Sequence, residues 1–231
     1  MDFILNGLQQ AVGLLLAGDP TTYSAVWATL RVSALAMTAC FVIGAPLGFL
    51  LGYTDFRGRR AVKTLVDTAL SFPTVVIGLV VFAFLSSRGP LGGLGLLFTI
   101  SGMAIGLTLL GLPIVIAMTA TAVENLDERL KPTLLTLGAN RRQVLLATLH
   151  EARFHMALAG AAAFGRIVSE VGIAMMVGGN IKWHTRTITT AIALETIKGE
   201  FAMGIALGLV LLLIALLVNL FLIKLRRRAR Q

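Results

Sequence analysis

The chain has 231 residues and a formal net charge of +9, with 57% hydrophobic and only 13% charged residues. So few charged side chains cannot cover the surface of a soluble protein of this length. Four runs contain no Asp, Glu, Lys or Arg, and each reaches the roughly 20 residues that cross a bilayer as a helix. These runs are residues 32–54, 68–87, 89–123 and 201–223. The sequence therefore predicts an all-α protein, a polytopic transmembrane helical bundle.

The positive charge is concentrated beside the apolar runs. Arg57, Arg59, Arg60 and Lys63 fill one short loop, and a second basic cluster follows residue 223. Clusters in these positions are typical of cytoplasmic loops, and no interleaving of aromatic and basic residues indicates nucleic-acid binding. We expect a lipid bilayer and no nucleic acid as partner, with the N-terminus outside and the C-terminus cytoplasmic.

Residues 1–18 show apolar residues at helical spacing but are too short and polar to span, which predicts an N-terminal interfacial helix. Five spans are expected to follow, at residues 20–53, 64–87, 97–122, 154–177 and 201–223. Pro73 should kink the second span because proline lacks a backbone N–H. The fourth span is expected to be one helix.

A polar insert, "KPTLLTLGANRRQVLLATLHEAR", lies within a cytoplasmic loop at residues 124–153. Its pattern predicts a short helix, a glycine break and a second helix that runs into the fourth span. Leu134, Leu135 and Leu137 would be costly to expose to water unless a partner covers them. A docking segment is the sharper interpretation, and packing against the protein's own inner face is the alternative.

The insert resembles the cytoplasmic loop of ABC importer permeases, in which Glu-Ala-Ala, three residues and a glycine introduce a coupling helix. Gly138 matches that glycine, whereas Pro132-Thr133-Leu134 stand where Glu-Ala-Ala is expected. "LHEARF" at 149–154 and "GRIVSEVGIAMMVGGNI" at 165–181 resemble the tungstate permeases, whose relatives are the molybdate and sulfate permeases. The resemblance covers essentially the whole chain and implies one permease domain over residues 1–231, with the type I ABC importer permease fold.

This resemblance implies the transmembrane subunit of an ATP-driven importer for a tetrahedral oxyanion, tungstate in the first place. Two ATPase subunits, an extracytoplasmic oxyanion-binding protein and a second copy of the chain would be its partners, in the inner membrane of a prokaryote. The implied ATPase-coupling residues are Thr133, Leu134, Leu137, Gly138, Ala139, Asn140 and Arg141. A molybdate or sulfate permease is the alternative, and a stand-alone channel or secondary anion carrier is a third possibility.

The chain has no glycine-rich lysine motif for phosphate binding, so it is expected to be a transport subunit and not an enzyme. ATP and Mg would be bound by the partner ATPase, and no cofactor by this chain. The histidines have no spacing typical of metal ligands, so no metal site is expected.

Arg166 and Glu170 stand four residues apart in the fourth span, so they can pair on one helix face. Charges at that depth normally face the bundle interior or a water-filled path. A structural ion pair and a lining of the anion path both remain open. Candidate path residues are Arg166, Ser169, Glu170, Gly172, Met175, Met176, Gly179 and Asn180. The hydroxyl-rich outer segment at 185–190 is expected either to attract an oxyanion or to be a solvated loop.

Overall fold

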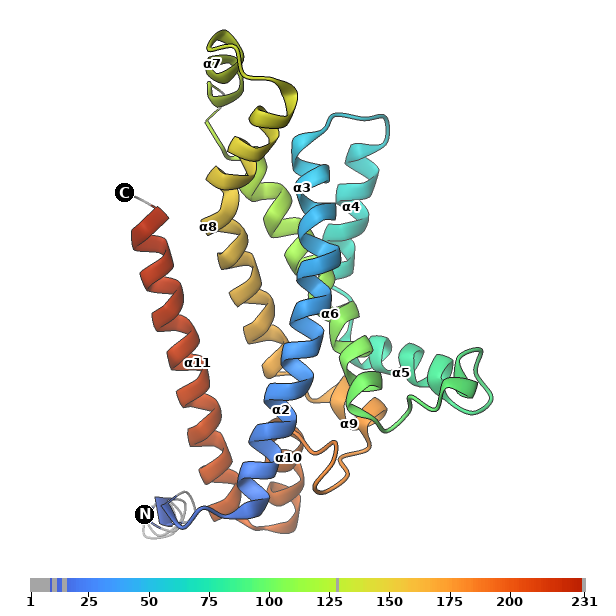
Figure 1. The fold of residues 1–231 in the computed structure, drawn as a ribbon. Helices are drawn as coiled ribbons and strands as arrows, with labels where there is room; N and C mark the ends of the chain where they lie inside the picture. Colours follow the sequence, from blue (N-terminus) through green and yellow to red (C-terminus); the bar gives the residue numbers. More distant parts are fainter. Residues whose placement is uncertain (1–8, 10–11, 14–15, 128, 230–231) are drawn as a thin grey trace. The chain divides into compact units, whose positions relative to one another are not determined.

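Figure 1 shows a computed structural model of the chain, which describes residues 9, 12–13, 16–127 and 129–229. The expected interfacial helix at 1–18 lies largely outside these residues, as does the end of the basic tail. Within the described part, the regular structure is helical and contains no strand, which confirms the predicted fold class.

The helices follow one another with short connections. Their bounds are α2 Pro20–Ala39, a π-helix at Cys40–Gly44, α3 Ala45–Tyr53, α4 Arg59–Leu70, α5 Thr74–Leu85, a 3₁₀ turn at Gly92–Leu94, α6 Ile100–Glu124, α7 Leu130–Thr136, α8 Arg141–Val168, α9 Gly172–Gly178, α10 Ile188–Lys198 and α11 Phe201–Ala229.

Among the described residues, three segments are long and apolar enough to span a membrane, namely Pro20–Tyr53, Ile100–Glu124 and Phe201–Val218. Two further spans are obtained if α4 with α5, and α8 with α9, each count as one bent span. The kink expected at Pro73 is a full break, because α4 ends at Leu70, α5 begins at Thr74 and the two helices are bent by 97°. Pro73 is the N-cap of α5 in an extended conformation, and its carbonyl accepts from the amides of Val76 and Ile77 at 3.0 and 3.2 Å.

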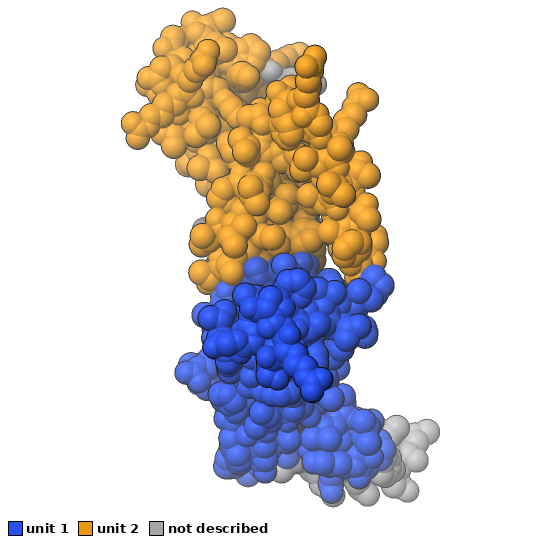
Figure 2. Space-filling view, turned by 90° about the vertical axis from the view of Figure 1, so that its right-hand side faces the viewer, with its two compact units in different colours: residues 1–36, 73–110, 165–219 blue, residues 37–72, 111–164, 220–231 orange. Residues whose placement is uncertain are grey.

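The chain forms two compact units, which Figure 2 distinguishes by colour. Unit 1 contains residues 1–36, 73–110 and 165–219, and unit 2 contains residues 37–72, 111–164 and 220–231.

In unit 2, α3 packs against α6 along a row of glycines spaced four residues apart, Gly44, Gly48 and Gly52. A Cβ built on Gly48 would lie 2.6 Å from the carbonyl oxygen of Ile116, and one built on Gly52 would lie 2.6 Å from that of Ala120. The two backbones approach so closely that no larger residue fits without movement. Small residues at this spacing are the usual device by which membrane helices pack closely.

In unit 1, α2, α10 and α11 share a core formed by Ala25, Ile188, Ala191 and Leu207. The amide of Ile188 donates to the hydroxyl of Thr29 at 2.8 Å, which connects the start of α10 to α2. A second contact joins α5 to α9, where Gly78 faces Met176 and Ile173. Much of the remaining apolar surface is exposed, above all on α11, as expected for helices that face lipid or another subunit.

Candidate coupling segment and transport site

The insert at 124–153 has the predicted helix–break–helix form. Helix α7 ends at Thr136, and Gly138 adopts a left-handed conformation with φ of +82°. The amides of Gly138 and Ala139 donate to the carbonyls of Leu135 and Leu134 at 3.0 and 2.9 Å, which satisfies the end of the helix. The left-handed turn explains why a glycine stands at this position.

Helix α8 begins with a reciprocal cap. The amide of Gln143 donates to the side-chain oxygen of Asn140 at 2.9 Å, and the amide of Asn140 donates to that of Gln143 at 2.8 Å. Both residues thereby satisfy amides that have no partner within the helix. Asn140, predicted as a coupling residue, therefore has a clear structural role.

The tip of this segment is apolar and uncovered. Leu137 is 78% exposed and Leu135 50% exposed, whereas Leu134 is half-buried. Thr133 and Arg141 are also exposed, and Ala139 is half-buried. The alternative in which the leucines pack on the protein's own inner face is therefore not supported for Leu135 and Leu137 within unit 2.

A cavity of about 510 Å³ lies beside this segment. Its lining combines apolar side chains with two cations, and consists of Tyr53, Lys131, Leu135, Arg141, Val144 and Leu145. The ammonium group of Lys131 lies 5.6 Å from the centre of the Tyr53 ring, within the range of a cation–π contact.

The fourth span differs from its expected form. Helix α8 ends at Val168, and α9 begins only at Gly172, so the expectation of one helix through 154–177 is corrected. The carbonyl of Glu170 accepts from the hydroxyl of Thr189 at 2.9 Å, and its side-chain Oε1 accepts from the amide of Ile173 at 3.2 Å. The hydrogen bond from Thr189, 19 positions away, replaces the bond that the Glu170 carbonyl would make within a continuous helix.

Arg166 and Glu170 nevertheless form the expected pair, although they do not share one continuous helix. Arg166 Nη1 lies 2.9 Å from Glu170 Oε2. The two side chains differ in environment, because that of Glu170 is 4% exposed and that of Arg166 is 40% exposed. A buried carboxylate therefore holds a guanidinium group whose other donors remain accessible in this unit.

The other predicted path residues occupy two different places. Ser169 donates to the carbonyl of Arg166 at 3.1 Å, and a Cβ on Gly172 would lie 3.3 Å from Glu170 Oε1, so both residues belong with the ion pair. Met175 is partly exposed, and Met176 faces Gly78 on α5.

Gly179 and Asn180 lie at the opposite end of α9, both with positive φ, of 68° and 50°. A seven-residue helix is roughly 10 Å long, so these two residues do not adjoin Arg166.

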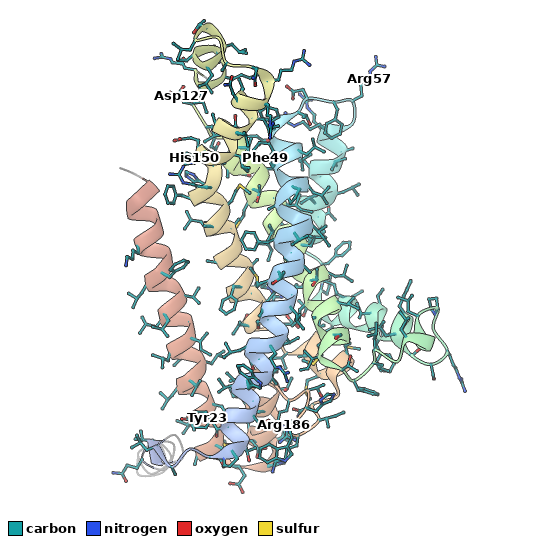
Figure 3. All side chains as sticks on the ribbon, in the orientation of Figure 1. Tyr23, Phe49, Arg57, Asp127, His150 and Arg186 are labelled. Carbon is teal, nitrogen blue, oxygen red and sulfur yellow. The ribbon has the colours of Figure 1, made fainter. Side chains whose placement is uncertain are left out.

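The hydroxyl-rich segment at 185–190 is not a solvated loop. Thr185 is buried and donates to the carbonyl of Gly178 at 2.5 Å, and Thr187 and Thr190 form a capping box at the start of α10. Arg186, which Figure 3 shows in the connection between α9 and α10, lies 3.8 Å from Glu195. These hydroxyls bond to the protein itself, and the expectation that they attract an oxyanion stays a prediction.

One charged cluster was not anticipated from the sequence. Arg59 and Lys63 at the start of α4 both bind Glu124 at the end of α6. Their spacing of four residues places the two cations on one face of α4. A partner 61 to 65 positions away leaves no trace in a single sequence.

A broken, charged span and an uncovered apolar segment on a helical membrane scaffold are typical of a membrane transport subunit. Residues 44–231 match the family described as binding-protein-dependent transport system inner membrane component, and the chain belongs to this family. Its members are permease subunits of the inner membrane.

Relatives extend over nearly the whole chain. The tungstate uptake system permease protein of Campylobacter jejuni is 48% identical over 98% of this chain and 95% of its own length. That of Peptoclostridium acidaminophilum is 38% identical over 95% and 96%. The molybdenum transport system permease protein of Azotobacter vinelandii is 29% identical over 86% and 92%.

Solved structures share the fold at low identity. A subunit of the MetNI methionine ABC transporter in an inward-facing conformation matches with a TM-score of 0.72 at 19% identity, over 90% of this chain and 96% of that one. A bacterial alginate ABC transporter in complex with a periplasmic protein matches with a TM-score of 0.74 at 21% identity, over 99% and 88%. Both are ABC importers, in agreement with the expected fold.

Proposed function

We propose that the chain is the transmembrane subunit of an ATP-driven importer for tungstate. The observation that carries this proposal is the 48% identity to the Campylobacter jejuni tungstate uptake permease along nearly the full length of both chains. The molybdenum and sulfate permeases are similar over comparable parts of this chain but only 29% and 26% identical. This gradient favours tungstate within one class of tetrahedral oxyanions.

The exposed tip of the 133–141 segment is the proposed site of energy coupling. Leu137, at 78% exposure, offers an apolar side chain beside the rigid turn at Gly138. Burial of a leucine side chain contributes about 1.5–3 kcal/mol, so a partner that covers it gains substantially. We infer that two ATPase subunits, which bind ATP and Mg, dock on this segment in two copies of the chain.

Arg166 is the proposed anion contact in the membrane. Guanidinium groups bind oxyanions through paired N–H donors, and Arg166 uses one nitrogen for Glu170 while its side chain stays 40% exposed. Glu170 neutralises the charge locally, which keeps anion binding weak enough for release. An extracytoplasmic protein would deliver the oxyanion from the side of the N-terminus, and the basic loops would face the cytoplasm.

The decisive experiment is ATP-dependent uptake into proteoliposomes that contain the chain, its ATPase and its binding protein. We expect uptake of tungstate, with molybdate a weaker competitor and sulfate the weakest. Leu137→Asp should abolish ATPase copurification, while Phe56→Asp, at an exposed apolar residue of another cytoplasmic loop, should not. Uptake without ATP or without the ATPase would overturn the proposal in favour of a channel or carrier.

A further inference from the structure

The ends of three helices in unit 2 meet at one arginine. Arg59, the first residue of α4, donates to four acceptors. Its Nε donates to the carbonyl of Leu51 at 2.9 Å, and its Nη2 donates to that of Gly52 at 3.3 Å. The two remaining acceptors are Asp55 Oδ1 and Glu124 Oε1, both at 2.6 Å. One guanidinium group thus connects the last turn of α3 to the last residue of α6.

Lys63 completes this cluster. Its ammonium group lies 2.8 and 2.7 Å from the two carboxylate oxygens of Glu124. We call Arg59, Lys63 and Glu124 the Arg59 cluster. Its side chains are 25%, 36% and 25% exposed, so water reaches each of them. Ion pairs with this exposure contribute modestly to stability, and their charges can be rehydrated when the helices move.

The position of the Arg59 cluster relates it to the coupling segment. Glu124 ends α6, and residues 125–129 alone connect it to α7. Helix α7 also contacts α3 directly, through Lys131 over the ring of Tyr53. Helices α3 and α6 approach backbone to backbone at Gly48 and Gly52 and so form one closely packed pair. The coupling segment is therefore connected to this pair at two points.

We propose that the Arg59 cluster transmits displacement of the α3–α6 pair to α4, with Arg59 as the positioning residue. This inference rests on the proposed function, in which the ATPase moves α7. The planar fork of Arg59 is required because it reaches the α3 carbonyls and the α6 carboxylate at the same time. A lysine at this position would keep the charge but could not span all of these acceptors.

The test uses the complete transporter in proteoliposomes and measures the number of ATP molecules hydrolysed per tungstate imported. The variants are Arg59→Lys, Arg59→Gln and Glu124→Gln. The matched control is Arg57→Gln, because Arg57 lies in the loop just before α4 with its side chain exposed and directed away from the helices (Figure 3).

We expect the ATP-to-tungstate ratio to rise about fivefold or more in the three variants, a factor at the lower end of allosteric coupling. The control should stay at the parent ratio. A higher ATP-to-tungstate ratio in Arg59→Lys would show that the position of the guanidinium group matters and not only its charge. An ion pair with a purely structural role would be restored by lysine. If Arg59→Gln fails to assemble, Arg59→Lys provides the test.

Parent-like ratios in Arg59→Lys and Glu124→Gln, with the ATPase bound, would overturn this inference and leave the proposed function intact. Failure of the parent chain itself to bind an ATPase would overturn the proposed function instead. Copurification of the ATPase, measured on the same preparations, distinguishes the two results.

Discussion

Replacement of Arg166 by alanine should destabilise the protein by leaving the Glu170 carboxylate without its cation. That carboxylate is 4% exposed and accepts two hydrogen bonds, from Arg166 Nη1 at 2.9 Å and from the amide of Ile173 at 3.2 Å. A hydrogen bond to a charged group contributes about 1.5–3 kcal/mol. Since Arg166 is 40% exposed, we expect Arg166→Ala to lower the free energy of unfolding by about 2 kcal/mol.

Replacement of Glu170 has a different cost. Glu170→Ala removes the bond to the Ile173 amide, for about 1 kcal/mol, and leaves a guanidinium group that can still reach water. The double variant no longer contains an isolated buried charge, so it should be about as stable as Glu170→Ala alone. The double-mutant cycle should therefore give an interaction free energy of about 2 kcal/mol.

Thermal unfolding of the purified permease measures this cycle. One kcal/mol corresponds to about 2–4 °C in a protein of this size, so Arg166→Ala should lower Tm by about 4–8 °C. The double variant should recover about half of that loss while tungstate uptake stays low, because the proposed anion contact is absent. Additive shifts in Tm would refute the buried-carboxylate argument, and normal uptake by the double variant would refute the role of Arg166 in the path.

Three further changes test the packing, the loops and the orientation. Gly48→Val should cost about 1–3 kcal/mol by overpacking, measured by Tm against Gly208→Val, because a Cβ added at Gly208 meets nothing within 4 Å. Equal shifts in Tm would contradict the α3–α6 contact. Thr189→Val should cost about 1–2 kcal/mol, because it strands the Glu170 carbonyl, and a Tm equal to the parent's would show that the bond contributes nothing. In a cysteine-free background, a cysteine at Ser87 should react with an external thiol reagent and one at Gly58 only after permeabilisation; the reverse pattern would invert the proposed topology.

Local chemistry made several features predictable from the sequence. The break at Pro73 follows from a missing amide, and the turn at Gly138 follows from a glycine between two helical patterns. The Arg166–Glu170 pair follows from a spacing of four residues and the cost of isolated charge in a membrane. Each of these depends on residues that are close together in the chain.

Features that depend on distant residues were not predictable in the same way. The break after Val168 has no proline within it, and it depends on Thr189 binding the Glu170 carbonyl. The hydroxyls at 185–190 look like a solvated loop in composition, but their partners are the last residue of α9, the break before α9 and the start of α10. The row of Gly44, Gly48 and Gly52 is the exception, because its spacing of four could have identified the α3–α6 contact directly.

The break in the fourth span meets two requirements that oppose each other in a membrane. The backbone groups must be hydrogen-bonded, and the Glu170 carboxylate must also have partners. Irregular backbone at that depth is tolerated only where its polar groups are satisfied by protein or line a water-filled path. The break satisfies the backbone of Glu170, because its amide donates to Ile167 and its carbonyl accepts from Thr189. The side chain of Glu170 then has both oxygens available, one for the start of α9 and one for Arg166. A continuous helix would use that backbone internally and would lose the start of α9 as a partner for the carboxylate. The break therefore stabilises a fixed carboxylate in the span, and the carboxylate in turn orients an accessible guanidinium group toward the place where we propose that the oxyanion passes.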